Sequence, residues 1–89
     1  MLIKKPKLQL GNPNNFFRDL GYAPLEAGQF AKPSRGYPRF HIYIKEGKDN
    51  YLINLHLDQK RPSYGKYTAH SGEYNSETVK IEAKRIMSY

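Results

Sequence analysis

Two runs of alternating residues occupy the middle of the chain. In residues 39–45 (RFHIYIK) the Phe and Ile side chains recur at even-numbered positions, and in residues 51–58 (YLINLHLD) Tyr, Ile and two Leu recur at odd-numbered positions. A repeat of two residues is typical of a β-strand with one buried face. Residues 46–50 (EGKDN) between the runs are rich in turn-forming types, so the pattern predicts an antiparallel β-hairpin.

The register of this hairpin is predicted by pairing apolar residues of one strand with apolar residues of the other. A shift of one residue would place the apolar side chains of a strand on the solvent face of the sheet. Pairing Ile42 with Ile53 satisfies that condition on the inner face. The same pairing gathers polar side chains of both strands on the reverse face: Arg39, His41, Asn54, His56 and Asp58.

A short helix is expected before the hairpin. Asn12 can cap the first amides of a helix, and Pro13 suits its first turn. Two phenylalanines and a leucine then recur at nearly helical spacing, and Gly21 can end the helix, so residues 13–20 are predicted to be helical. Residues 1–11 form either a basic arm, which we favour, or an edge strand whose lysines and proline discourage further pairing.

The remaining segments are predicted to be two loops and a final helix. Residues 22–38 are rich in Gly and Pro, which favours a loop. Residues 59–75 also read as a loop, with room for a short third strand near Tyr67. Asn75 or Ser76 can cap the last helix, whose apolar stripe consists of Val79, Ala83 and Ile86.

These elements define the fold class as α+β. We expect one small domain, residues 12–89, preceded by the segment 1–11, since a chain of 89 residues supports a single core. Its antiparallel sheet is centred on the hairpin 39–45/51–58. The N-terminal short helix and the C-terminal helix pack on one face of that sheet.

The amino-acid composition bears on the cellular location expected for the protein. The absence of cysteine excludes disulfides and thiolate chemistry and favours a reducing, cytoplasmic location. No apolar stretch approaches the roughly 20 residues that span a bilayer, so no membrane association is expected. The start of the chain, MLIKKPKLQL, lacks the apolar region of a secretion signal.

The net charge of +7 is unevenly distributed. Residues 1–45 hold eight basic and two acidic residues, a charge of +6, whereas residues 46–89 hold seven basic and six acidic residues, a charge of +1. Such an excess favours a polyanionic partner, above all nucleic acid, RNA before DNA. The alternative is that the charge serves solubility alone, as in many small domains.

Our main functional prediction is therefore a basic domain that binds RNA. Basic side chains supply salt-dependent affinity for phosphates, and exposed aromatic rings stack on unpaired bases. The predicted binding residues are Arg18, Lys32, Arg35, Arg39, Tyr43, Lys60 and Arg61. The competing interpretation is a protein-interaction or structural module, with the tyrosines used for packing and an exposed edge strand able to pair with a second copy.

An alternative function is cleavage of RNA by a small histidine-dependent or metal-dependent nuclease. A histidine of nearly neutral pKa can take a proton from a 2′-hydroxyl, and we nominate His56 or His70 as that base. Asp58 is two residues from His56 on the same strand and can act with it. Arg39 would stabilise the charge that develops on the phosphate.

No resident organic cofactor is expected, but the histidines and acids also predict a divalent metal site. Its ligands would be two or three residues drawn from His41, His56, Asp58, His70 and Glu73. Mixed nitrogen and carboxylate ligands suit zinc and similar ions. The plainer interpretation is that these residues are solvated on an exposed sheet face, with Asp58 paired to a Lys or Arg.

Three blocks of sequence, YPRFHIYI, NLHLDQKRPSY and AHSGEY, resemble a group of small uncharacterised bacterial proteins seen mainly in candidate-phyla genomes. That resemblance spans about residues 37–86 and implies no activity. The order of elements, with FFRDLGY followed by a hairpin and a closing helix, is similar to the HicA-type toxins, which implies a double-stranded-RNA-binding-like fold and RNA cleavage. The glycine-serine-histidine-histidine run of those toxins is absent, and only His41 lies on a comparable strand.

Overall fold

The structure is a computed structural model and describes residues 1–59, 72–73 and 76–89. Its elements in chain order are β1 (Leu2–Pro6), α1 (Lys7–Leu10), α2 (Pro13–Asp19), β2 (Ala23–Pro24), β3 (Gln29–Lys32), β4 (Arg39–Glu46), β5 (Asn50–Asp58), β6 (Gly72–Glu73) and α3 (Glu77–Ser88). The strands form one antiparallel sheet in the order β1-β5-β4-β3-β2, and β6 also pairs with β5. The predicted α+β class is confirmed.

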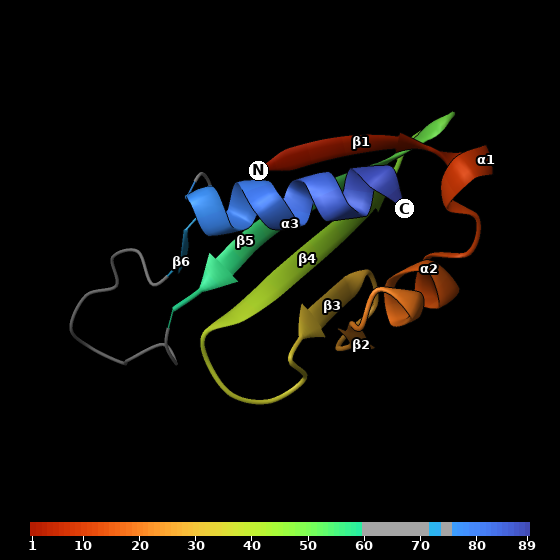
Figure 1. Cartoon of the computed structure of the whole chain (residues 1–89). Coiled ribbons are helices and arrows are strands. Elements are labelled where there is room, and N and C mark those ends of the chain that lie inside the picture. The colour runs from red at the N-terminus through yellow and green to blue at the C-terminus, as the bar shows by residue number, and fades with distance from the viewer. Residues whose placement is uncertain (60–71, 74–75) are drawn as a thin grey trace.

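The core lies between the sheet and the helices, which cover one of its faces (Figure 1). Leu55, Ile42 and Phe30 are direct neighbours on β5, β4 and β3 and point into this core. From α3, which lies against β5 and β1, the predicted stripe of Val79, Ala83 and Ile86 joins the same core, with exposed fractions of 0%, 3% and 0%. Burial of this stripe accounts for the position of the helix on the sheet.

The hairpin exists as predicted, but its predicted register is wrong by two residues. Ile42 pairs with Leu55 rather than with Ile53, and His41 pairs with His56. A shift of two residues keeps every side chain on its predicted face, so the apolar pattern accepts both registers. The turn decides between them: the strands continue to the Glu46–Tyr51 pair, and the Gly47 amide donates a 2.8 Å hydrogen bond to the Asn50 carbonyl.

Residues 1–11 and residues 22–38, which precede the hairpin, both contribute strands to the sheet. Residues 2–6, for which an arm was favoured over an edge strand, form β1 and pair with β5. The prediction of a continuous loop over residues 22–38 is wrong at β2 and β3, which pair with each other and, through β3, with β4. The loop prediction failed because these strands, of two and four residues, are too short for an alternating pattern to show in the sequence.

The two predicted helices begin at the expected residues. The Asn12 side chain accepts a hydrogen bond from the Asn15 amide, and α2 ends at Asp19, one residue before the predicted end. At the start of α3 the Ser76 hydroxyl accepts from the Val79 amide. The third strand predicted near Tyr67 lies outside the described residues. Within residues 1–59, 72–73 and 76–89, no helix has the length and apolar character that a membrane crossing requires.

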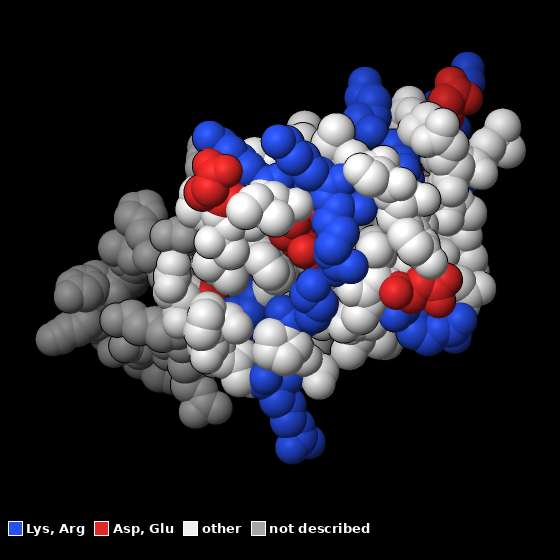
Figure 2. Space-filling model, viewed as in Figure 1, with Lys and Arg blue, Asp and Glu red and all other residues white. Residues whose placement is uncertain are grey.

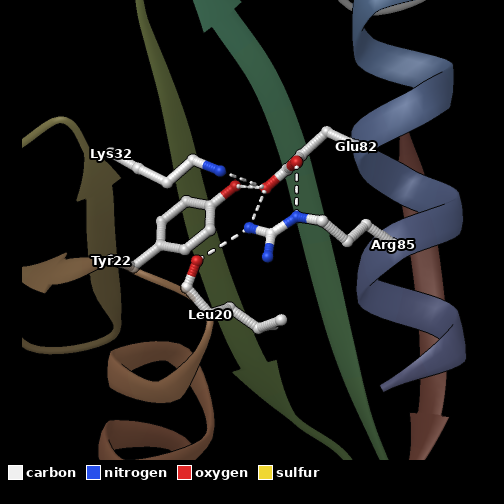
Figure 3. A network of polar contacts seen from close by, with 5 residues as sticks. All are labelled: Leu20, Tyr22, Lys32, Glu82 and Arg85. Atoms are coloured by element: carbon white, nitrogen blue, oxygen red, sulfur yellow. Dashed lines mark hydrogen bonds and ion pairs between the residues drawn. The ribbon is translucent and has the colours of Figure 1, made fainter.

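A buried carboxylate on α3 connects this helix to β3 and to the residue just before β2 (Figure 3). Glu82 is only 5% exposed, and it accepts hydrogen bonds from the Tyr22 hydroxyl at 2.6 Å and from Lys32 at 3.2 Å. Arg85 donates to the same carboxylate at 2.8 and 2.9 Å and to the Leu20 carbonyl at 2.7 Å. The network positions α3 and explains why a glutamate occupies the inner side of this helix.

Candidate functional site

The sheet face opposite the helices carries the polar residues that the sequence analysis singled out. We call it the open face and define it by the alternate strand positions that point away from the core. These positions are Leu2, Lys4, Gln29, Ala31, Arg39, His41, Tyr43, Lys45, Leu52, Asn54, His56 and Asp58. Among them there are three Lys or Arg residues and a single acid.

Strand pairing arranges the open face in rows that cross the sheet. Lys4 and Lys45 flank Leu52 in one row, because β1 and β4 both pair with β5 there. The next row contains Asn54 and Tyr43, and the row after it contains His56 and His41. The row that holds Tyr43 therefore lies between the two lysines and the two histidines.

Asp58 stands between the two histidines. Its Oδ1 lies 3.0 Å from His56 Nε2, and its Oδ2 lies 3.1 Å from His41 Nδ1. Arg39 donates from Nε to the same Oδ2 at 3.4 Å. The other ring nitrogen of His41, Nε2, lies 3.0 Å from the Gln29 side-chain oxygen. One carboxylate thus joins groups from two adjacent strands, and β3 supplies a further contact.

Tyr43 covers the edge of this cluster with its ring. The ring stacks on His41 at a centroid distance of 4.6 Å and on His56 at 5.6 Å, with interplanar angles of 23° and 21°. Tyr43 remains 43% exposed, whereas each histidine is 7% exposed. The two histidines are therefore mostly buried, and the tyrosine ring is the most exposed part of the cluster.

The surroundings of His56 favour its neutral form. Burial lowers the pKa of the imidazole, the Asp58 carboxylate raises it, and His41 lowers it further; the net pKa is below its ordinary value. A neutral imidazole at neutral pH has a lone pair that can accept a proton or bind a metal ion. The site can therefore do acid-base or coordination chemistry.

The structure brings together some of the predicted site residues and separates others. His41, His56, Asp58 and Arg39 form one cluster beneath Tyr43. The other described residues of the predicted RNA-binding set lie elsewhere. Arg18 is on α2, Arg35 is in the loop before β4, and Lys32 contacts Glu82 on the helix-covered side.

Four predicted residues have no described side-chain position. His70, Lys60 and Arg61 lie outside the described residues, and only the backbone of Glu73 is described, as part of β6. Their predicted roles therefore stay predictions.

Sequence reasoning missed three residues of this face. Gln29 was assigned to a loop, and its contact with His41 depends on the pairing of β3 with β4. Lys4 was counted only as part of the net charge. Strand alternation placed Lys45 on the same face as Tyr43, but Lys45 was not assigned a binding role. The signal for Lys4 required knowing that residues 2–6 pair with β5.

No family model, curated protein or solved structure matches this chain.

Proposed function

We propose that the protein binds single-stranded RNA on the open face of its sheet. The observation that carries the proposal is the exposed ring of Tyr43, held in place by His41 and His56, one row from Lys4 and Lys45. Aromatic rings on a sheet stack on unpaired bases, and neighbouring lysines contact the phosphates between those bases.

The distribution of charge supports the open face over the helix-covered side. Figure 2 shows that acidic side chains are interspersed among the basic ones on the helix-covered side. On the open face the single acid, Asp58, is already neutralised by contact with Arg39. An RNA strand would therefore meet unopposed positive charge from Lys4 and Lys45, both of which are exposed.

Binding can be tested with a fluorescently labelled single-stranded RNA in anisotropy titrations at several salt concentrations. The double variant Lys4→Gln/Lys45→Gln should weaken binding and reduce the slope of log affinity against log salt by about 1.4, which is the loss of two phosphate contacts. The matched control is Lys80→Gln/Lys84→Gln, which removes the same charge from exposed positions of α3. Equal losses in both double variants, or no binding by the parent protein at low salt, would contradict the proposal.

Cleavage of RNA on the same face is a second candidate, favoured by the 3.0 Å contact between His56 and Asp58. A carboxylate in this position orients an imidazole, which can then transfer protons during attack by a 2′-hydroxyl. Incubation of end-labelled RNA with the protein should give products that His56→Ala or His70→Ala no longer forms. Cleavage that survives in both variants would exclude these histidines as the base.

A further inference from the structure

The cluster on the open face has the composition of a metal site. His41, His56 and Asp58 each offer one ligand atom, and these atoms all lie within 4.8 Å of one another. Ligands around a zinc-sized ion, each about 2.0–2.2 Å from it, are separated by roughly 3.2–3.6 Å in tetrahedral geometry. The observed separations are 3.1 Å from Asp58 Oδ2 to His41 Nδ1 and 3.0 Å from Asp58 Oδ1 to His56 Nε2. Both lie just below that range and involve the two oxygens of one carboxylate.

Both nitrogens of the His41 ring face hydrogen-bond acceptors. Its Nδ1 faces an Asp58 oxygen and its Nε2 faces the Gln29 oxygen, and both of these oxygens are hydrogen-bond acceptors. A neutral imidazole has one N–H to donate, so one of the two contacts would place lone pair against lone pair. Either a second proton on the ring or a metal cation at Nδ1 removes this conflict. With a metal ion, Nε2–H donates to Gln29 while Nδ1 and Asp58 share the ion.

We propose that His41, His56 and Asp58 bind a divalent transition-metal ion of the zinc type, with Gln29 as a positioning residue for His41. Metal-binding histidines commonly donate their second N–H to a carbonyl or carboxylate oxygen, and Gln29 stands in that place. Two imidazoles and one carboxylate suit zinc or cobalt better than magnesium or calcium, which prefer oxygen ligands alone. The proposal does not depend on RNA binding.

The strands make the ligand set rigid. His41 and His56 are direct neighbours across the central pair β4 and β5, and Asp58 follows His56 by two residues on the same strand. Three protein ligands leave one position of a tetrahedral ion for a further ligand. Arg39 lies 3.4 Å from Asp58 Oδ2 and repels a cation there, so the charge of Arg39 should limit the affinity of the site.

The test is calorimetric titration of the full chain, without a histidine tag and after treatment with a chelator, using Zn²⁺ alone and then Co²⁺ alone. We expect one ion per chain and the visible absorption of four-coordinate Co²⁺. His41→Ala and His56→Ala should each weaken binding at least about 100-fold, and Gln29→Leu about 10-fold. Arg39→Gln should strengthen binding several-fold, which a purely structural ion pair would not do.

Asp58→Asn guards against variants that fail to fold, because it keeps the size of the side chain and should still weaken binding at least about 10-fold. Its matched control is Asp49→Asn, which neutralises an exposed acid outside the cluster and should leave binding unchanged. The proposal is overturned if the parent chain binds neither ion more tightly than about 100 μM, or if Asp58→Asn and Asp49→Asn bind equally well. RNA titrations in the presence of a chelator test the proposed RNA binding independently of metal binding.

Discussion

The hydroxyl of Tyr22 donates a 2.6 Å hydrogen bond to the carboxylate of Glu82, joining the segment before β2 to α3. Sixty residues separate the two in the sequence. Both side chains are almost fully buried, with exposed fractions of 3% and 5%. A hydrogen bond to a buried charged group contributes more to stability than one between neutral groups, so this contact is a natural place to probe the fold.

Replacing Glu82 should destabilise the protein in a graded way. Glu82→Leu removes the acceptor from three donors at once, and we expect a loss of about 2–4 kcal/mol in the free energy of unfolding. Tyr22→Phe removes one hydrogen bond and should cost about 1–2 kcal/mol. Denaturant unfolding monitored by circular dichroism measures both. Similar stability of Glu82→Leu and the parent protein would show that the network does not hold α3.

The contribution of Glu82 should also depend on pH. Burial raises the pKa of this carboxyl, but hydrogen bonds from Arg85 and Tyr22 and the charge of Lys32 outweigh burial, so the pKa lies below its ordinary value of 4.5. Because the folded pKa is depressed, the stabilisation is fully present above 4.5 and is lost as the pH falls through the folded pKa.

This pH dependence can be isolated by comparing the parent protein with Glu82→Gln. The stability difference between them should be constant from neutral pH down to about pH 5 and shrink at lower pH, where the parent carboxyl becomes protonated. Denaturant titrations across the acid range give the difference at each pH. A gap that stays constant down to about pH 2 would mean that the pKa of Glu82 is not depressed in the way described.

Tyr43 should be the main aromatic contact with RNA. Tyr43→Ala removes the exposed ring of the open face, and we expect affinity for single-stranded RNA to fall by about 1–3 kcal/mol, or roughly 5- to 150-fold. Tyr89→Ala is the matched control, because Tyr89 is 60% exposed at the end of the chain beyond α3. Anisotropy titrations at one salt concentration suffice, and an equal effect of the two substitutions would remove Tyr43 from the interface.

The N-terminal segment should be needed for stability, since β1 is part of the sheet. Ile3 is 3% exposed and belongs to the core, whereas Leu8 is fully exposed at 100%. Ile3→Ala should therefore cost about 2–4 kcal/mol, and Leu8→Ala should change stability by less than about 0.5 kcal/mol. Thermal or denaturant unfolding distinguishes the two, and a negligible effect of Ile3→Ala would favour the basic arm.

The sequence by itself determined the elements whose patterns are local. Alternation in residues 39–45 and 51–58 predicted two strands and the face on which each side chain lies, because that face depends only on odd or even position. Asn12 predicted the start of one helix, and Asn75 or Ser76 predicted the start of the other, because capping needs only groups a few residues apart. On that basis His41, His56 and Asp58 were already candidates for one surface.

The tertiary structure decided whatever depended on distant pairing. The true register brought His41 opposite His56, which the apolar pattern could not distinguish from a register two residues away. Pairing of β3 with β4 brings Gln29 into contact with His41, and pairing of β1 with β5 places Lys4 on the open face. Glu82 is buried because Tyr22, Lys32 and Arg85 converge on it, and no local pattern encodes that convergence.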